Sequence, residues 1–180
     1  SAGVLDDGVM VQQTWERFSR VLAPKVTGAW ALHELTKERK DLEFFVLFSS
    51  VAALTGSPGQ SNYASGNAFM DGLAAYRRSI GLPALSINWG PWAEVGMAAN
   101  LETSSRGWTA DGMGAIGLKE GFDLFGKLIL QDTPQAAVMP FRWPKFFEEF
   151  PLMARQTMLA DLAKRRDKNP GTVEMWFERW

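Results

Sequence analysis

The chain contains 180 residues, of which 46% are hydrophobic and 22% charged, and this balance suits one ordinary domain with a sizeable core. Because 19 Lys and Arg residues nearly cancel 20 Asp and Glu residues, the basic surface that nucleic acid or an anionic membrane would require is not expected. The lack of cysteine and the single histidine argue against thiolate, iron–sulfur and ordinary histidine-based metal sites. The longest apolar run is far shorter than a membrane span, and the first residues do not resemble a secretory leader. We therefore expect a soluble, cytoplasmic protein that binds neither a metal ion nor nucleic acid.

The amino-terminal part of the chain is predicted to be mainly helical. Val9 to Glu38 has a helical pattern, but Pro24 lacks an amide donor and should kink the helix or start a new segment. Before it, Ser1-Ala-Gly3 resembles the end of a strand that already lies inside a sheet. The strands predicted below are too few for a stable open sheet with helices on both faces. We therefore expect that an amino-terminal half is missing from this sequence.

The middle of the chain predicts a strand–helix–strand unit. Glu43 to Ser50 is rich in β-forming residues without polar alternation, which favours a strand buried on both faces, and Ala84 to Trp89 is a second such strand. Between them, Ser61 to Ser79 has apolar residues at three- and four-residue spacing, and Ser61 or Asn62 can cap its start. This is a βαβ unit, which winds right-handed and binds ligands at the carboxyl ends of its strands.

The rest of the chain predicts a loop, a helix and a final strand. Gly, Ser, Thr and Asn dominate Gly96 to Gly117, which indicates a mobile excursion above the site. A helix over Leu118 to Leu130 and a short strand over Ala136 to Pro140 are expected to close the domain. We assign residues 1–150 to one catalytic subdomain and residues 151–180 to a carboxyl-terminal helix and interdomain linker.

Three polar side chains of the strand–helix–strand unit are predicted to converge. Tyr63 and Asn67 are four residues apart and therefore share one face of the predicted helix, and Ser50 ends the first strand. A tyrosine hydroxyl with a pKa of about 10 is a poor acid at neutral pH, but a nearby ammonium such as that of Lys25 stabilises the phenolate and lowers that pKa. Tyr63 then becomes a proton donor. The alternative is that Tyr63 is a helix-surface aromatic residue and Ser50 a turn residue.

Four motifs occur together and in order: Lys25, Phe48-Ser-Ser50, Gly59-Gln-Ser-Asn-Tyr-Ala-Ser-Gly-Asn67 and Asn88-Trp-Gly-Pro-Trp92. They resemble the ketoreductase domain of modular polyketide synthases, which has the short-chain dehydrogenase/reductase fold. The resemblance covers about residues 1–150 and implies an α/β protein with a Rossmann-like, doubly wound parallel sheet. The chain would be the carboxyl-terminal part of that fold, because the first βαβ units and the glycine-rich cofactor turn would precede Ser1.

The resemblance implies a role for each of four side chains. Tyr63 corresponds to the general acid that protonates the ketone oxygen as a hydride arrives from NADPH, and Ser50 to the hydroxyl that hydrogen-bonds the same oxygen. Lys25 corresponds to the lysine that holds the nicotinamide ribose and lowers the pKa of the tyrosine. Asn67 corresponds to the residue that exchanges places with this lysine relative to most short-chain reductases. These four residues are the expected catalytic set.

The resemblance also implies a cofactor pocket and a lid after the second strand. Lys25, Tyr63, Pro91 and Trp92 are expected to contact NADPH. Met97 would belong to the lid over the acyl chain. We predict that the Gly96 to Gly117 excursion is this lid, because its composition permits ordering only when something fills the cleft.

Residues near the start of the chain resemble a stereochemical fingerprint. Leu5-Asp6-Asp7 resembles the motif of B-type ketoreductases, which give a D-configured β-hydroxyl group. Thr55 stands where an A-type enzyme would have tryptophan, and Gln60 stands where another subtype has histidine. The alternative interpretation of the motif is an exposed turn with a helix cap. The residues expected to control the substrate are Leu5, Asp6, Asp7, Gln60 and Met97.

The leading hypothesis for function is an enzyme of polyketide chain elongation. It would use NADPH to reduce a β-ketoacyl thioester on an acyl carrier protein to a D-β-hydroxyacyl thioester. Its expected partners are that carrier protein, the neighbouring synthase domains and the missing amino-terminal half. The second hypothesis is a catalytically silent, structural or truncated reductase half within a multidomain synthase, and the third is a free-standing short-chain reductase that acts on another ketone. Four intact polar side chains favour an enzyme, whereas the missing cofactor turn favours a silent domain.

Two further motifs suggest other functions, but their sequence contexts argue against those functions. Gly112-Met-Gly-Ala-Ile-Gly117 matches G-x-G-x-x-G, but the residues before it are polar and irregular, whereas a dinucleotide fingerprint follows a strand. His33 lies on a predicted helix far in sequence from Ser50, and no G-x-S-x-G elbow of a serine hydrolase is present. His33 is therefore expected to be an ordinary helix-face residue.

Overall fold

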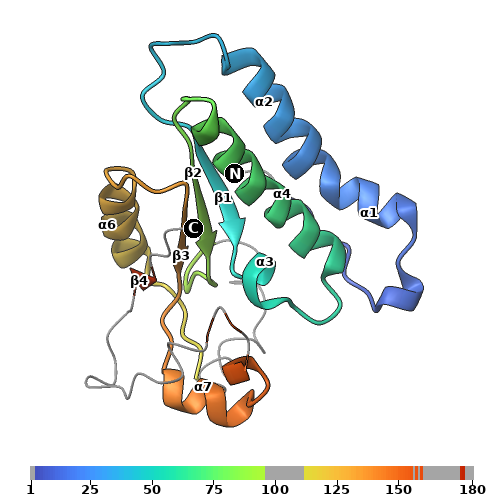
Figure 1. Cartoon of the computed structure of the whole chain (residues 1–180). Coiled ribbons are helices and arrows are strands. Elements are labelled where there is room, and N and C mark those ends of the chain that lie inside the picture. The colour runs from blue at the N-terminus through green and yellow to red at the C-terminus, as the bar shows by residue number, and fades with distance from the viewer. Residues whose placement is uncertain (1–2, 96–111, 156, 158, 160–174, 177–180) are drawn as a thin grey trace. The chain divides into compact units, whose positions relative to one another are not determined.

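A computed structural model describes residues 3–95, 112–155, 157, 159 and 175–176 (Figure 1). The chain divides into two compact units, and each is described by itself. The first unit comprises residues 1–89, 126–138 and 176–180, and the second comprises residues 90–125 and 139–175. Within the described residues, no helix combines the length and apolar character needed to cross a membrane.

The first unit is built on a parallel sheet. Strand β1 (Val46–Ser50) pairs in parallel with β2 (Leu85–Trp89), which pairs in parallel with β3 (Gln135–Val138). The full strand order is β1-β2-β3-β4, where β4 contains Met175–Trp176. Helix α4 (Ser61–Ser79) connects β1 to β2 and lies across the sheet in Figure 1. The predicted strand–helix–strand unit is therefore confirmed, and both strands end at the same edge, with Ser50 opposite Trp89.

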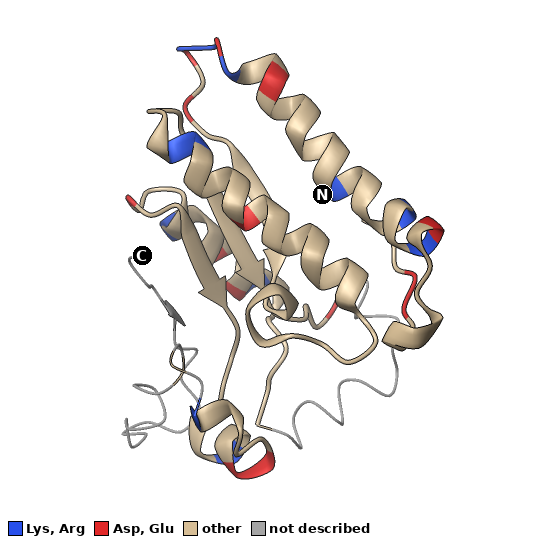
Figure 2. Ribbon diagram, turned by 45° about the vertical axis from the view of Figure 1, so that its right-hand side comes forward, with Lys and Arg blue, Asp and Glu red and all other residues tan. Residues whose placement is uncertain are grey.

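The predicted burial is confirmed for β2 but not for β1. All five residues of β2 are buried, as expected for a central strand, and none is charged (Figure 2). The prediction that β1 is buried on both faces is wrong, because Phe48 is 37% exposed and the strand begins only at Val46. The ring of Phe48 contacts Trp89, at 5.8 Å between ring centroids, and this partner covers only part of it. The core on which α4 packs consists of Ala29, Leu47, Met70, Leu73, Ala74 and Ala84.

The helical region near the start of the chain is nearly continuous across Pro24. Helix α1 (Trp15–Leu22) passes through a π-helical turn, η2 (Ala23–Thr27), directly into α2 (Gly28–Thr36). The Gly28 amide donates to the Ala23 carbonyl five residues earlier, so the wider turn accommodates the proline without a break. The predicted new segment at Pro24 is thus a change of helix type. Figures 1 and 2 show α1 and α2 running side by side with α4.

The ends of α4 follow from local chemistry. Gln60 is its N-cap and makes no side-chain cap bond, so the prediction that Ser61 or Asn62 caps the helix is wrong. The Asn62 side chain instead accepts a hydrogen bond from the Tyr63 amide, at 2.7 Å. At the other end the chain reverses at Gly81, whose φ of +78° is a conformation that favours glycine. Short elements precede these helices, namely η1 (Met10–Gln12) before α1 and α3 (Ala52–Thr55) before α4.

The remaining helices confirm part of the predicted order. Helix α6 (Leu118–Leu128) occupies the segment predicted to be helical, and β3 overlaps the predicted final strand. The second unit contains α7 (Trp143–Glu149) and a 3-10 turn, η3 (Met153–Arg155), besides the first part of α6. Most of the predicted lid, the helix expected after Pro151 and the first two residues of the chain lie outside the described residues.

Candidate active site

The secondary structure places the four predicted catalytic residues within the first unit. Ser50 is the last residue of β1, and Tyr63 and Asn67 lie one turn apart on α4. Lys25 lies in the π-helical turn η2. A single-turn π segment inside an α-helix is often found at functional sites, because it redirects side chains that a regular helix would place elsewhere.

Lys25, Asn67 and Tyr63 meet between η2 and α4. The Lys25 side chain is only 4% exposed, and its Nζ donates a hydrogen bond to Asn67 Oδ1 at 2.9 Å. The same Nζ lies 5.2 Å from the centroid of the Tyr63 ring, which is a cation–π contact. Gly66 of α4 allows the Lys25 side chain to lie close to the helix, because a Cβ atom at this position would lie only 3.3 Å from Lys25 Cδ. The prediction that an ammonium adjoins Tyr63 is confirmed by this geometry.

Burial makes the charge of Lys25 adjustable. Removal from water lowers the pKa of the Lys25 ammonium from 10.5 to about 8, and the negative charge of Asp71 partly opposes this effect. A lysine with a pKa near 8 is still mainly charged at neutral pH. It loses that charge as the pH rises above about 8.

Ser50 is held at the end of β1 by hydrogen bonds from β2 and from the start of α3. Its carbonyl accepts a hydrogen bond from Asn88 Nδ2 at 3.1 Å, and its hydroxyl accepts one from the Ala52 amide at 3.2 Å. The neighbouring Ser49 hydroxyl donates to the Asn67 carbonyl at 3.2 Å, so the end of β1 is bonded to the turn of α4 that carries Asn67. Ser50 and Tyr63 are thus placed on adjoining elements, β1 and α4.

Asp71 was missed by the sequence analysis. It follows Asn67 by four residues on α4, and its carboxylate accepts hydrogen bonds from the Ser86 hydroxyl at 2.6 Å and from Asn88 Nδ2 at 2.9 Å. A signal for it was present, because Ser86 and Asn88 are polar residues in a strand predicted to be buried. Buried polar side chains need hydrogen-bond partners, and an acidic residue on the covering helix can supply them.

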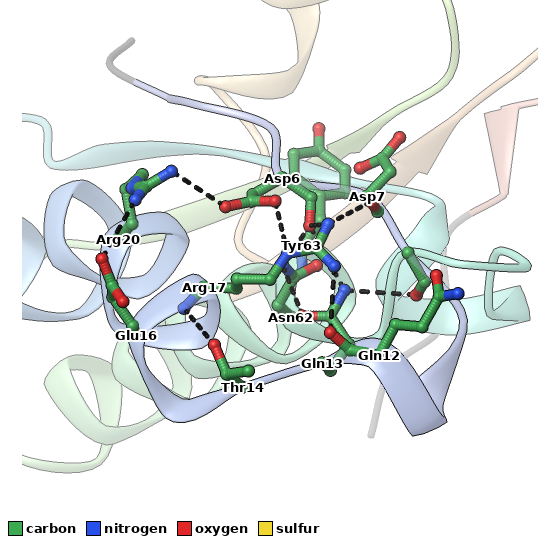
Figure 3. Close-up of polar contacts among 11 residues, drawn as sticks. Asp6, Asp7, Gln12, Gln13, Thr14, Glu16, Arg17, Arg20, Asn62 and Tyr63 are labelled. Atoms are coloured by element: carbon green, nitrogen blue, oxygen red, sulfur yellow. Dashed lines mark hydrogen bonds and ion pairs between the residues drawn. The ribbon is translucent and has the colours of Figure 1, made fainter.

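The proposed fingerprint residues form an ordered loop beside the start of α4 (Figure 3). The Asp6 carboxylate pairs with Arg17 at 2.6 Å and with Arg20 at 3.1 Å, and the Asp6 side chain is only 16% exposed. Arg17 also donates to the Gln12 and Asp7 carbonyls. These contacts fix the loop against α1, and they are more extensive than those of a simple exposed turn.

The same loop contacts α4 directly before Tyr63. Asn62 Nδ2 donates to the Asp6 carbonyl at 2.8 Å, and Gln60 Nε2 donates to the Asp7 carboxylate at 2.9 Å (Figure 3). The Gly8 amide donates to the Gly59 carbonyl at 2.8 Å. The structure therefore brings Asp6, Asp7 and Gln60 together, while Leu5 remains 40% exposed beside them.

Pro91 and Trp92 lie in the second unit. The Pro91 carbonyl accepts a hydrogen bond from the Ile116 amide at 2.8 Å. The Trp92 ring packs over Gly121 of α6, where a Cβ atom would collide with it, and makes an edge contact with Phe122 at 6.3 Å. Their predicted contact with NADPH stays a prediction. Met97 lies outside the described residues.

The two motifs set aside in the sequence have packing roles in the structure. Gly112 has a φ of +81°, and a Cβ atom there would lie 2.6 Å from the Phe146 amide nitrogen. This glycine therefore allows close backbone packing in the second unit. His33 is 2% exposed, and its Nδ1 lies 3.2 Å from Arg77 Nη1. His33 is thus a buried partner of Arg77 and not an ordinary helix-face residue as predicted.

Comparison with known proteins identifies the family. The model of the KR domain matches residues 1–94, which is just over half of the 180-residue chain. The chain belongs to this family. KR domains are NAD(P)-dependent ketoreductases with a Rossmann-like fold, and the parallel sheet described above agrees with it. The predicted α/β fold and the resemblance to polyketide synthase ketoreductases are therefore confirmed.

Individual relatives of this KR chain are parts of much larger proteins. Over 162 residues it is 40% identical to one component of the phenolphthiocerol/phthiocerol polyketide synthase of Mycobacterium tuberculosis, covering 90% of this chain and 7% of that protein. It is also similar to the first ketoreductase of the tylosin PKS, with 35% identity, a TM-score of 0.74, and coverage of 86% of this chain and 33% of that one. An A-type ketoreductase from a modular polyketide synthase shares 40% identity at a TM-score of 0.77, covering 83% of this chain and 31% of that one. Because an A-type enzyme is this similar, overall likeness does not assign the KR chain to the B-type.

Proposed function

We propose that this KR chain carries the catalytic residues for NADPH-dependent reduction of a β-ketoacyl thioester to a β-hydroxyacyl thioester in polyketide chain elongation. The observation that carries the proposal is the buried Lys25 ammonium, bonded to Asn67 at 2.9 Å and lying against the Tyr63 ring at 5.2 Å. This arrangement supports proton donation by Tyr63, because a positive charge beside the phenol stabilises the negative charge that appears when the proton leaves.

The residues around Lys25 fit a ribose of the cofactor. An ammonium has three N–H donors, and within the described part of the chain Asn67 Oδ1 accepts one of them. A buried ammonium gains from further acceptors, and the hydroxyl oxygens of a sugar are suitable ones. We therefore assign ribose binding to Lys25. When bound, NADPH would supply a hydride to the ketone carbon.

The protein residues complete the reaction by moving one proton. As the carbonyl carbon gains the hydride, its oxygen becomes an alkoxide, and the Tyr63 O–H bond breaks while a new O–H bond forms on that oxygen. The Tyr63 oxygen then recovers a proton from solvent. Ser50 would hydrogen-bond the same substrate oxygen, and the positive charge of Lys25 would stabilise the transient phenolate.

The proposal extends to the substrate and the product configuration. We propose that the thioester is attached to an acyl carrier protein and that the chain works with neighbouring synthase domains. We also propose B-type stereochemistry, with a D-configured hydroxyl group. The loop that carries Asp6 and Asp7 is bonded to Asn62 and Gln60, the residues just before Tyr63, which supports a role in guiding the acyl chain toward that tyrosine.

Substitution of the two tyrosines of α4 tests the reaction. In the protein carrying this chain, Tyr63→Phe should lower the turnover of NADPH with a β-ketoacyl thioester by at least about a hundredfold, the usual contribution of positioned acid–base catalysis. Tyr76→Phe is the matched control, because Tyr76 lies on the same helix and is 45% exposed. Near-normal turnover by the Tyr63 variant, or no NADPH oxidation by the wild type, would refute the proposed function.

Chiral chromatography of the product tests the configuration separately. The expected product is predominantly the D-β-hydroxyacyl thioester. A predominantly L-configured product would show that the Leu5-Asp6-Asp7 loop does not have the proposed meaning, while leaving the reduction itself in place.

A further inference from the structure

Asp71 occupies the same face of α4 as the proposed catalytic residues. Tyr63, Asn67 and Asp71 follow one another at four-residue steps, which places them along one side of the helix. Asp71 is half-buried and faces β2, where Ser86 and Asn88 donate hydrogen bonds to its two carboxylate oxygens at 2.6 and 2.9 Å. Placing a charged carboxylate here costs free energy, since burial raises the pKa of Asp71 and so disfavours its charged form.

Asn88 connects this carboxylate to the end of β1. Besides Asp71, Asn88 Nδ2 lies within hydrogen-bond distance of the Ser49 hydroxyl at 3.0 Å and the Ser50 carbonyl at 3.1 Å. The Asn88 Oδ1 atom accepts from Gln135 Nε2 at 2.9 Å, which fixes the orientation of the amide. Asp71 and Gln135 together orient the Asn88 amide, which donates to the Ser50 carbonyl.

The same bonds lead back to Lys25. The Ser49 hydroxyl, which Asn88 contacts, donates to the Asn67 carbonyl, and the Asn67 side chain accepts from Lys25. Asp71 also acts on Lys25 directly through its charge. Among the described titratable groups on α1, α2 and α4, the ones that face Lys25 are Tyr63, by its ring, and Asp71, by its negative charge.

We propose that Asp71 is a positioning residue for ketone reduction, which fixes the end of β1 at Ser50 through Asn88 and is connected to Lys25 by the hydrogen bonds that run from Asn88 through Ser49 and Asn67. The inference rests on the proposed function. It explains why a carboxylate remains half-buried against two strands that contain no charged residue. It assigns no contact with substrate to Asp71, so its effect is expected on the pH dependence of the reaction.

The first test is the pH–rate profile of Asp71→Asn, which keeps the shape of the side chain and removes its charge. Without the opposing charge, Lys25 loses its proton at lower pH, so the alkaline fall in kcat should begin at lower pH than in the wild type. At pH 8 the charged fraction of Lys25, and with it the rate, should be severalfold lower in Asp71→Asn than in the wild type, because an opposite charge has been removed. At pH 6, where Lys25 is charged in both proteins, the difference should be much smaller.

Two controls separate positioning from general effects. Asp41→Asn removes a carboxylate that pairs with Arg39 on the surface, and its pH–rate profile should match the wild type. Asp71→Glu keeps the negative charge, so the alkaline fall in its kcat should begin at a pH closer to that of the wild type than it does in Asp71→Asn. The proposal is overturned if the alkaline fall in kcat begins at the same pH in Asp71→Asn as in the wild type. It is also overturned if Asp71→Asn is unfolded, since that would show a purely structural role.

The second test reads Lys25 without any catalysis. The 13Cε resonance of Lys25 in lysine-labelled protein can be assigned by its loss in Lys25→Met and followed with pH. It should titrate near pH 8 in the wild type and at lower pH in Asp71→Asn. A shifted titration in a protein that reduces no ketone would refute the proposed function alone, whereas identical titrations in the two proteins would refute the role of Asp71.

Discussion

Two buried cations are associated with helix α4 and are held in different ways: Lys25, from η2, packs against its first turns, whereas Arg77 belongs to its last turn. Lys25 is 4% exposed and its ammonium donates to Asn67, with the carboxylate of Asp71 acting on it through space. Arg77 is fully buried, and its guanidinium donates to the Thr36 hydroxyl at 3.1 Å and the Pro83 carbonyl at 3.2 Å.

The surroundings of Arg77 are those of a structural anchor. Its guanidinium lies 3.8 Å from the centroid of the Phe45 ring and 3.2 Å from His33 Nδ1. Burial lowers the pKa of both side chains, and the charge of Arg77 lowers that of His33 further, which keeps the imidazole neutral and able to accept a hydrogen bond. These contacts tie α2, the segment before β1 and the turn after α4 to one side chain.

The two cations differ in how their charge responds to pH. A guanidinium stays charged at any pH that a folded protein meets, so the Arg77 end is electrostatically fixed. A buried ammonium changes its charge within the accessible range, here near pH 8, so the Lys25 end can respond to its neighbours. If the proposed function holds, burial has a functional consequence at Lys25 and a structural one at Arg77.

Replacing each cation by methionine is the most direct way to break this comparison, and Lys25→Met should have the largest effect. Turnover of a β-ketoacyl thioester should fall by at least about a hundredfold, because the charge beside Tyr63 is lost. The protein should nevertheless become more stable. The shift of the Lys25 pKa from 10.5 to about 8 corresponds to roughly 3 kcal/mol at neutral pH, and about 1 kcal/mol is returned when Asn67 loses its partner.

Urea denaturation at pH 7 measures this change, and a gain of about 2 kcal/mol in the free energy of unfolding is expected. Lys37→Met is the matched control, because Lys37 pairs with Glu34 on the surface and its loss should alter neither rate nor stability appreciably. A Lys25→Met protein that is less stable than the wild type would show that the buried ammonium has a structural role.

Arg77→Met should have the opposite pattern. It leaves the Thr36, Pro83 and His33 acceptors without their donor, and we expect the free energy of unfolding to fall by about 2 kcal/mol with turnover within about twofold of normal. Thermal unfolding and NADPH turnover measure the two quantities. The neighbouring Arg78, which pairs with Asp132 on the surface, provides the control variant Arg78→Met. A catalytic loss in Arg77→Met as large as in Lys25→Met would remove the distinction between the two cations.

The pH dependence of stability sharpens the comparison with a smaller effect. The folded-state pKa of Lys25 is below its unfolded value, so the unfolded chain binds more protons between about pH 8 and 10.5, and the contribution of Lys25 to stability rises with pH across this window. The wild type should therefore gain stability relative to Lys25→Met as the pH increases from 8 to 10. Parallel pH–stability curves for the two proteins would contradict the buried, charged state of Lys25.

Much of this fold could be predicted from the sequence because its periodic patterns are strong. Helix α4 has the predicted bounds, the shared face of Tyr63 and Asn67 followed from their spacing, and the placement of Lys25 beside them was implied by the resemblance to polyketide synthase ketoreductases. The continuity of the helix through Pro24 could not be predicted, since a π-helical turn that accommodates a proline has no composition of its own.

Asp71 was also missed, although the polar residues Ser86 and Asn88 in a buried strand indicated that some partner must contact them. A single acidic residue on an amphipathic helix normally faces water, and its partners Ser86 and Asn88 come from a strand fifteen and seventeen residues further along the chain. Only the folded arrangement places the three together. The exposure of Phe48 was missed for a related reason, because an apolar run does not reveal how well the neighbouring layer covers it.

The most direct test of the central claim follows the hydride and the proton donor together. The protein carrying this chain is incubated with NADPH that carries deuterium at both hydrogen positions of nicotinamide C4 and with a β-ketoacyl thioester, and the product is analysed by mass spectrometry. The account predicts one deuterium on the β-carbon of a β-hydroxyacyl thioester, formed by the wild type and Tyr76→Phe but at least about a hundredfold more slowly by Tyr63→Phe. A product without deuterium, or one formed equally fast by the Tyr63 variant, would contradict it.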